Sequence, residues 1–182
     1  MIDFFYKVLC WPMFFLGRNK SMVLEDLKYW KIRYGKEHLI DFKAFCCFMK
    51  YYPEYRYVFY YRMPFLYRHI FNVFLPKLKS ICISTNCSKV GGGIFACHGF
   101  SSIIVADSIG KNFVFFQNVT VGYNRGGNPT IGDNVQIFAG AVVAGPIHIG
   151  NDVKIGANAV VLQDIPDGSI VYGNPCIIKS KN

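Results

Sequence analysis

The fold is decided by the stretch from Pro129 to Val161, which reads PTIGDNVQIFAGAVVAGPIHIGNDVKIGANAVV. In this stretch a branched aliphatic residue returns every six residues, at 131, 137, 143, 149, 155 and 161. The residue that follows is often Gly or Ala, and the fifth position of each hexad is again apolar. A helix does not repeat with this period, whereas a unit of one short strand and one tight turn does. The pattern therefore predicts a solenoid whose coils contain three hexads each, with the aliphatic residues stacked inside.

The same period continues towards the N-terminus, at Ile103, Ile109, Phe115 and Val121. The step from Val121 to Ile131 is ten residues instead of six, so four extra residues must leave the coils there. They lie within YNRGGNPT, residues 123–130. Because an insertion in a solenoid usually marks the binding face, this loop is a candidate part of the functional site.

The composition changes near Ser80. Residues 1–80 contain 23 of the 31 aromatic residues and 14 Lys and Arg against six Asp and Glu, whereas residues 81–182 contain 15 of the 17 glycines and six basic against five acidic residues. In residues 21–80 apolar side chains recur at spacings of three and four, which favours helices. The predicted fold class is mainly β, with an aromatic, basic α-helical region in residues 1–80 and a parallel β-helix in residues 81–182.

Seven cysteines without a CxxC pair argue for reduced thiols in the cytoplasm, and against disulfides and a zinc ribbon. No metal and no nucleic-acid partner are expected. Between Lys7 and Arg18 only ten residues are uncharged, about half of a membrane span. Two interpretations stay open for the N-terminal residues 2–20: a helix on the protein's own core, or a peripheral helix on a membrane surface. The aromatic segment of residues 51–71 fits contact with a membrane, a glycan or another subunit, or burial in an oligomer interface.

Residues 81–182 resemble the hexapeptide-repeat acyltransferases, whose coils form a left-handed β-helix. The segments HGFSSIIVADSIGKNF (98–113), FFQNVTVGY (115–123), the stretch quoted first and the closing DIPDGSIVYGNP (164–175) are similar to the serine acetyltransferase branch. Within it they are most similar to the enzymes that modify capsular or other surface polysaccharides. The resemblance implies acetyl-CoA as the co-substrate and a homotrimer with active sites between neighbouring copies.

The resemblance places His98 on the histidine that serves as the catalytic base. An alcohol is a poor nucleophile until an imidazole accepts its proton, so this role suits acyl transfer to a hydroxyl. Cys97 is not expected to assist, because successive side chains of a strand point to opposite faces. His148 is expected to be structural or exposed.

The chain departs from serine acetyltransferases at two places. Their carboxylate about fifteen residues before the base is missing from ISTNCSKVGGGIF (83–95), and Asn128 stands where a second histidine is expected. We expect Ser84 or Thr85 to orient His98 instead, and Asn128 to help backbone N–H groups polarise the thioester carbonyl. Both departures weaken free serine as the acceptor.

The expected site for acetyl-CoA follows from the repeat. Ala139 and Ala157 are 18 residues apart, one full coil, and therefore stack beside Gly140 and Asn158. Small residues there would let the pantetheine arm lie against exposed backbone. Lys179 is the candidate contact for the nucleotide phosphates.

These observations predict an acetyl-CoA-dependent O-acetyltransferase that acts on a hydroxyl of a bacterial surface polysaccharide or its lipid-linked precursor. Three alternatives stay open: a serine O-acetyltransferase of cysteine biosynthesis, an N-acyltransferase that acts on an amino sugar, and a catalytically silent scaffold.

Overall fold

The computed structural model describes residues 4–16 and 20–179 and divides the chain into two compact units, Met1–Leu78 and Lys79–Asn182. The division lies two residues before the boundary expected from the composition. Within the described residues, no helix combines the length and the apolar character that crossing a membrane requires.

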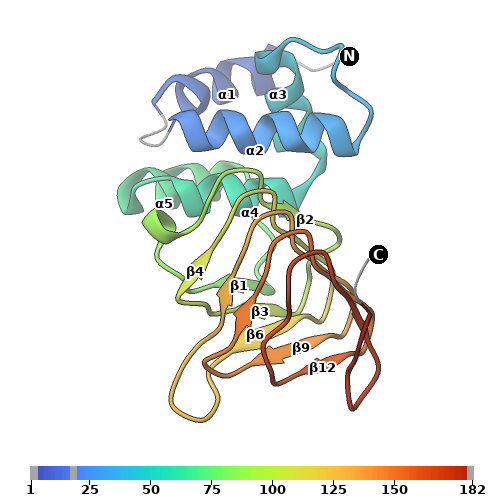
Figure 1. Cartoon of the computed structure of the whole chain (residues 1–182). Coiled ribbons are helices and arrows are strands. Elements are labelled where there is room, and N and C mark those ends of the chain that lie inside the picture. Colours follow the sequence, from blue (N-terminus) through green and yellow to red (C-terminus); the bar gives the residue numbers. More distant parts are fainter. Residues whose placement is uncertain (1–3, 17–19, 180–182) are drawn as a thin grey trace. The chain divides into compact units, whose positions relative to one another are not determined.

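The described residues of the first unit form five helices (Figure 1): α1 (Phe4–Leu16), α2 (Lys20–Arg33), α3 (Asp41–Tyr51), α4 (Pro53–Arg62) and α5 (Phe65–Phe74). Two prolines set the boundaries of α4. Pro53 occupies its first turn, where the missing N–H of proline costs no helical hydrogen bond. Met63 precedes Pro64 and is extended, with φ −89° and ψ 150°, because the proline ring disfavours the helical conformation for the residue before it.

The core of the helical unit is aromatic. The fully buried ring of Trp30 contacts Phe48 and Tyr55 edge-on, with centroids 5.7 and 5.0 Å apart. The guanidinium of Arg62 donates two hydrogen bonds to the buried carboxylate of Asp26, at 2.9 and 3.2 Å. The unit therefore depends on individual packed partners and on a buried charge pair.

The aromatic segment of residues 51–71 divides between two environments, and one of them, the core of its own unit, was not among the environments expected from the sequence. Most aromatic side chains of α4 are buried in the unit's own core: Tyr55, Tyr57, Phe59 and Tyr60. On α5 most apolar side chains are instead exposed: Phe65, Leu66, Tyr67, Ile70, Val73 and Phe74. Packing in the protein's own core thus explains α4 and not α5.

The second unit is a parallel β-helix with three faces (Figure 1). The first face contains β1 (Ile81–Ile83), β3 (Ser102–Ile104), β6 (Thr120–Gly122), β9 (Val142–Ala144) and β12 (Val160–Val161). The second contains β4 (Ser108–Ile109), β7 (Thr130–Ile131) and β10 (His148–Ile149). The third contains β2 (Phe95–Ala96), β5 (Val114–Phe115), β8 (Gln136–Ile137), β11 (Lys154–Ile155), β13 (Ile170–Tyr172) and β14 (Ile177–Lys179). Only β14 pairs antiparallel among the strands described, so the predicted mainly-β solenoid with an N-terminal helical region is confirmed.

The predicted inward residues are buried at every position but one. Ile103 is 51% exposed, whereas its neighbour Ile104 is fully buried. The register explains the difference, because Ile104 pairs with Val121 and the step between them is 17 residues. A strict count of six from Ile109 therefore assigned the wrong isoleucine to the core.

Positive φ angles recur at the corners of the coils. Between the second and third faces, Asn112, Asn134 and Asp152 adopt φ of 57°, 58° and 57°. Their side chains form a ladder, in which Asn112 Nδ2 donates to Asn134 Oδ1 at 2.8 Å and Asn134 Nδ2 donates to Asp152 Oδ1 at 3.0 Å. Asn and Asp tolerate the left-handed conformation better than other non-glycine residues, which explains their place in the repeat.

Candidate functional site

His98 lies two residues after the end of β2, at the corner between the third and first faces. Its side chain is exposed and its φ is 52°, so it sits in a left-handed turn and not on a strand. Cys97 still continues the strand pairing, since its N–H donates to the Phe115 carbonyl at 2.9 Å. The expected strand alternation of Cys97 and His98 was therefore wrong, because the chain bends between them.

Three further levels of the β-helix stack at the same corner, which we call the His98 corner: residues 97–101, 116–118, 138–140 and 156–158. The Gly140 N–H donates to the Gln117 carbonyl at 3.0 Å, and the Asn158 N–H donates to the Ala139 carbonyl at 2.9 Å. Gln117, Ala139 and Ala157 thus occupy successive levels beyond His98. The structure brings the predicted base and four of the five predicted acetyl-CoA residues to one corner of the fold.

The surface of this corner is shaped by small side chains. Ala139 and Gly140 are half-buried, and Ala157 and Asn158 are exposed. A Cβ atom at Gly140 would collide with Oδ1 of Asn158, so these two levels approach more closely than a side chain allows. The rings of Phe116 and Phe138 stack next to them, with centroids 4.9 Å apart. An extended ligand could therefore reach the backbone along the corner.

Lys179 is connected to this corner through Tyr172. Its ammonium group lies 5.5 Å from the centre of the Tyr172 ring. A Cβ atom on Gly156, the residue before Ala157, would lie 3.4 Å from Cβ of Tyr172. Lys179 thus contacts a tyrosine whose Cβ lies beside the last level of the corner.

Asn128 lies at a different corner, between the first and second faces. Its Nδ2 donates to Oδ1 of Asp107 at 3.3 Å, and its buried Oδ1 has no partner among the described residues. The loop that carries it is a tight hairpin: Asn124 and Gly127 exchange backbone hydrogen bonds, while Arg125 and Gly126 both have positive φ. Within one chain, the structure does not bring Asn128 to His98.

The residues expected to orient His98 are engaged elsewhere. Thr85 Oγ1 accepts a hydrogen bond from the Ala106 N–H at 2.9 Å, at the corner that also holds Asp107. Ser84 lies 3.3 Å from the Cys82 sulfur. In the part of the chain that the structure describes, no hydrogen bond to the His98 imidazole is found. The expectation for Ser84 and Thr85 was wrong, because β1 pairs with β3 and places both residues at the far end of the first face.

One polar residue of the His98 corner was missed. Gln117 lies one level beyond His98, and its buried Oε1 has no partner within the described residues. The hexad pattern predicts its position in a turn, but not that its amide oxygen is enclosed. His148 is exposed, as expected, and Nδ1 of its ring lies 2.9 Å from the Thr130 hydroxyl.

No group of three His, Cys, Asp or Glu within residues 4–16 and 20–179 could hold a metal ion.

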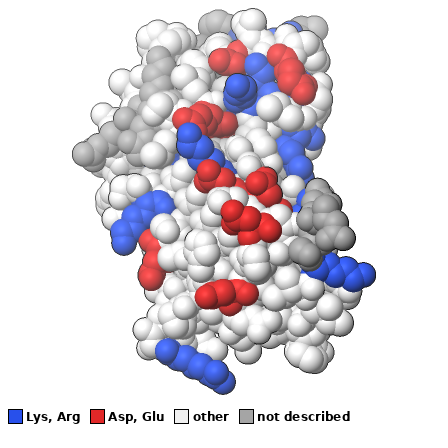
Figure 2. All heavy atoms as spheres, in the orientation of Figure 1, with Lys and Arg blue, Asp and Glu red and all other residues white. Residues whose placement is uncertain are grey.

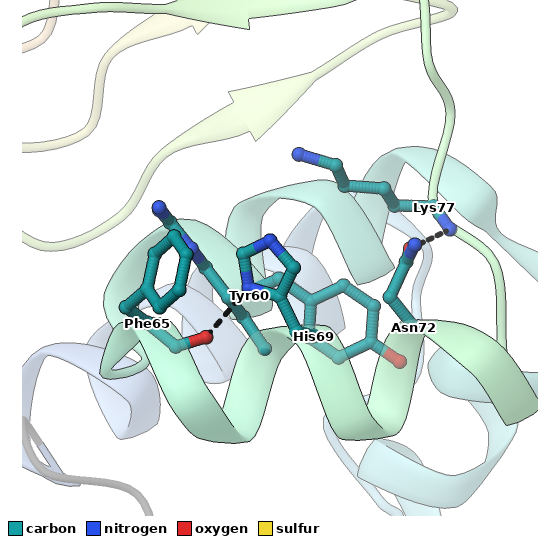
Figure 3. Close-up of a pocket in the computed structure, with 6 residues that line it drawn as sticks. Tyr60, Phe65, His69, Asn72 and Lys77 are labelled. Atoms are coloured by element: carbon teal, nitrogen blue, oxygen red, sulfur yellow. Dashed lines mark hydrogen bonds between the residues drawn. The ribbon is translucent and has the colours of Figure 1, made fainter.

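The helical unit contains a separate pocket, lined by Tyr60, Phe65, Arg68, His69, Asn72 and Lys77 (Figure 3). Its polar groups serve the local backbone. The Tyr60 hydroxyl donates towards the carbonyls of Phe71 and Leu75, and burial raises the pKa of this hydroxyl. Asn72 Oδ1 accepts from the Lys77 N–H at 3.0 Å. These bonds end α5 and hold the segment that follows it, so the pocket has a structural role of its own.

Comparison with known proteins agrees with the geometry of the β-helix. A family model described as "Bacterial transferase hexapeptide (six repeats)" matches residues 128–163. A serine acetyltransferase of Helicobacter pylori is 42% identical over 92 residues, which cover 48% of this chain and 54% of that protein. One from Staphylococcus aureus is 46% identical over 93 residues, covering 48% and 44%. The chain thus spans about half the length of the curated relatives it matches.

Solved structures show the same fold. The crystal structure of Neisseria gonorrhoeae serine acetyltransferase in complex with serine superposes with a TM-score of 0.61 at 26% identity, covering 86% of this chain and 67% of that one. A serine acetyltransferase in complex with CoA gives a TM-score of 0.62 at 19% identity, covering 94% and 74%.

Proposed function

We propose that this chain is an acetyl-CoA-dependent acetyltransferase that acts on a hydroxyl group, with His98 as the general base. The observation that carries the proposal is the His98 corner, where the exposed imidazole shares one edge of the β-helix with Ala139, Gly140, Ala157 and Asn158. The matching hexapeptide repeats and the similarity to serine acetyltransferases support the same chemistry.

The reaction needs one proton acceptor and one polarised carbonyl. The neutral imidazole of His98 takes the proton of the acceptor hydroxyl while its oxygen attacks the thioester carbonyl. The tetrahedral oxyanion is stabilised by N–H donors, and the carbon–sulfur bond then breaks. The imidazolium returns the proton to the CoA thiolate. The pantetheine arm lies along Ala139 and Ala157, and Lys179 meets the nucleotide phosphates.

Two acceptors have specific support. The comparisons favour L-serine, because the similar proteins are named serine acetyltransferases and one solved structure contains serine. A hydroxyl of a surface polysaccharide or its lipid-linked precursor is the second candidate. It is favoured by residues 83–95, which contain no carboxylate to pair with His98, and by Asn128, which is held by Asp107. An amino sugar would use the same base with nitrogen as the nucleophile, and a silent scaffold would use no base at all.

The proposed assembly is a homotrimer in the cytoplasm, peripheral at the inner face of the membrane. Three copies would let Asn128 of one copy approach the His98 corner of the next, which one chain alone does not allow. Asn128 Nδ2 carries two hydrogens and gives one to Asp107, so at most one is left for a thioester carbonyl.

The test compares L-serine, a lipid-linked oligosaccharide and an amino sugar as acceptors for one preparation, with release of CoA as the readout. We expect saturable acetyl transfer to at least one of them, and none in the His98→Ala variant. Saturable transfer to L-serine assigns the acceptor that the comparisons favour. If the protein neither transfers acetyl to any of the three acceptors nor hydrolyses acetyl-CoA, the proposal is overturned and the catalytically silent scaffold is the remaining interpretation.

A further inference from the structure

Helix α1 is apolar on both of its sides. On the inner side Cys10, Met13 and Phe14 are buried, and the Phe14 ring packs 5.2 Å from that of Phe45 in α3. The outer side is also apolar. It exposes the α1 face, which consists of Phe4, Phe5, Val8, Trp11, Phe15 and Leu16. Single exposed apolar residues are ordinary, but a continuous stripe of large ones marks a surface that is covered by something.

The stripe has the spacing of one helix side. Phe4, Val8, Trp11 and Phe15 follow each other at four, three and four residues, and they are 82%, 56%, 60% and 50% exposed. An apolar groove next to them is lined by Lys7, Val8, Trp11 and Phe42. The apolar surface therefore extends from α1 onto the beginning of α3.

Two cationic groups, Lys7 and Lys50, lie beside the α1 face, and the carboxylate of Asp41 at the start of α3 is already paired with Lys31 at 2.8 Å. Lys7 is the only charged residue of α1, and the Lys50 ammonium lies 5.0 Å from the Tyr6 ring on the same helix. On the face of the helical unit that Figure 2 draws, basic and acidic groups lie next to one another. Attraction by charge alone would therefore not select a membrane. Burial of the apolar α1 face, together with the cationic groups at its edge, would favour a membrane surface.

We propose that the α1 face docks in the plane of a membrane surface that contains anionic phospholipid. With 13 residues α1 is about 20 Å long, too short for a hydrocarbon core of about 30 Å. Lying in the interface, its Phe and Trp side chains reach the acyl chains while Lys7 and Lys50 stay among the headgroups. A second copy docked through the same face would bring two cationic rims together, and α1 offers no carboxylate to neutralise them.

Tryptophan fluorescence tests the proposal, because the chain has two tryptophans in opposite environments. Trp30 is fully buried and Trp11 is 60% exposed. We expect a blue shift and sedimentation of the full-length protein with phosphatidylglycerol vesicles, and at least tenfold weaker binding to phosphatidylcholine vesicles. The Trp30→Phe variant should keep the shift, whereas the Trp11→Phe variant should still bind but lose it.

Charge placed on the α1 face gives the matched control. Val8→Glu and Phe4→Glu should each weaken vesicle binding at least tenfold, whereas Ile32→Glu, an equally drastic change on α2 where Ile32 is 48% exposed, should not. Equal losses for Ile32→Glu would overturn the role of α1. Absence of vesicle binding, with Val8→Glu lowering the oligomer mass in light scattering, would assign the face to a second copy and overturn the proposal. The inference rests on the peripheral location given under the proposed function and not on its chemistry. His98→Ala should bind vesicles like the wild type, so acetyl transfer and membrane docking can fail independently.

Discussion

The β-helical unit repeats one contact at successive levels, whereas the helical unit makes each of its contacts once. At one corner of the β-helix, neighbouring coils are joined by the same kind of side-chain hydrogen bond, which Asn112 donates to Asn134 and Asn134 donates to Asp152. In the helical unit, Arg62 and Asp26 form a buried pair that no other residues of the described chain reproduce. The repeated contact can be weakened at one level while the others remain. When a contact that occurs once is removed, no equivalent contact remains to hold the same elements together.

The same difference bears on the candidate functional site. If the repeat served stability alone, every coil could have the same length. A coil whose length differs from that of its neighbours therefore indicates a requirement other than stability, such as binding. The His98 corner includes such a coil. Paired residues of the first two coils are 19 apart before this corner, as in Ala96 and Phe115, and 17 apart after it, as in Ile104 and Val121. The turn that carries His98 is therefore two residues longer than the turn stacked on it.

The largest expected effect concerns His98. Replacing it by alanine should lower the rate of acetyl transfer by about two to four orders of magnitude, the usual contribution of a general base. Because the side chain is exposed, the unfolding temperature and the affinity for CoA should hardly change. The rate of CoA release measures acetyl transfer, and calorimetry of CoA binding is the control for an intact donor site. Activity within tenfold of the wild type would remove His98 from the mechanism.

The next effect concerns the unique contact of the helical unit. Asp26→Ala leaves the guanidinium of Arg62 buried without its carboxylate, which should cost about 3–5 kcal/mol of unfolding free energy. Asn134→Ala removes both hydrogen bonds of the ladder and puts alanine at a φ of 58°, but the backbone pairing of β8 with β5 and β11 remains, so it should cost less, about 2 kcal/mol. Chemical denaturation followed by circular dichroism measures both. Equal losses would mean that the two units do not differ in the way described.

The third effect concerns the proposed acetyl-CoA site along the His98 corner. Ala157→Trp should fold normally, because residue 157 is exposed, but it should lower the affinity for CoA at least tenfold by covering the backbone at the last level of the corner. Leu162→Trp, an exposed position of the same coil, is the matched control. Unchanged CoA affinity in folded Ala157→Trp would place the donor elsewhere.

Sequence reasoning succeeded where the chain repeats and failed where partners are set by register. The hexads identified the coils and the stacking of Ala139 on Ala157, and the structure places His98 at the same corner. The periodicity missed the slip at Ile103, because strand pairing sets the register and the hexad count does not. It also could not show that Thr85 bonds to Ala106 or that the amide oxygen of Gln117 is enclosed. For residues 2–20 it left open a helix on the protein's own core or on a membrane surface, and α1 in fact buries one apolar side and exposes another. For α5 it predicted a helix, but not its exposed apolar face.

The smallest effect concerns Asn128, the one insertion residue for which sequence and structure favour different roles. If its amide mainly clamps the loop to Asp107, Asn128→Ala and Asp107→Ala should each cost about 0.5–1.5 kcal/mol. The double variant should cost little more than either single one, because both changes remove the same bond. Asn128→Asp should be worse than Asn128→Ala, since it sets two carboxylates 3.3 Å apart. We expect acetyl transfer to fall less than tenfold in the alanine variant. A hundredfold loss of kcat at unchanged stability, restored by glutamine, would instead mean that Asn128 of a neighbouring copy donates to the reacting carbonyl.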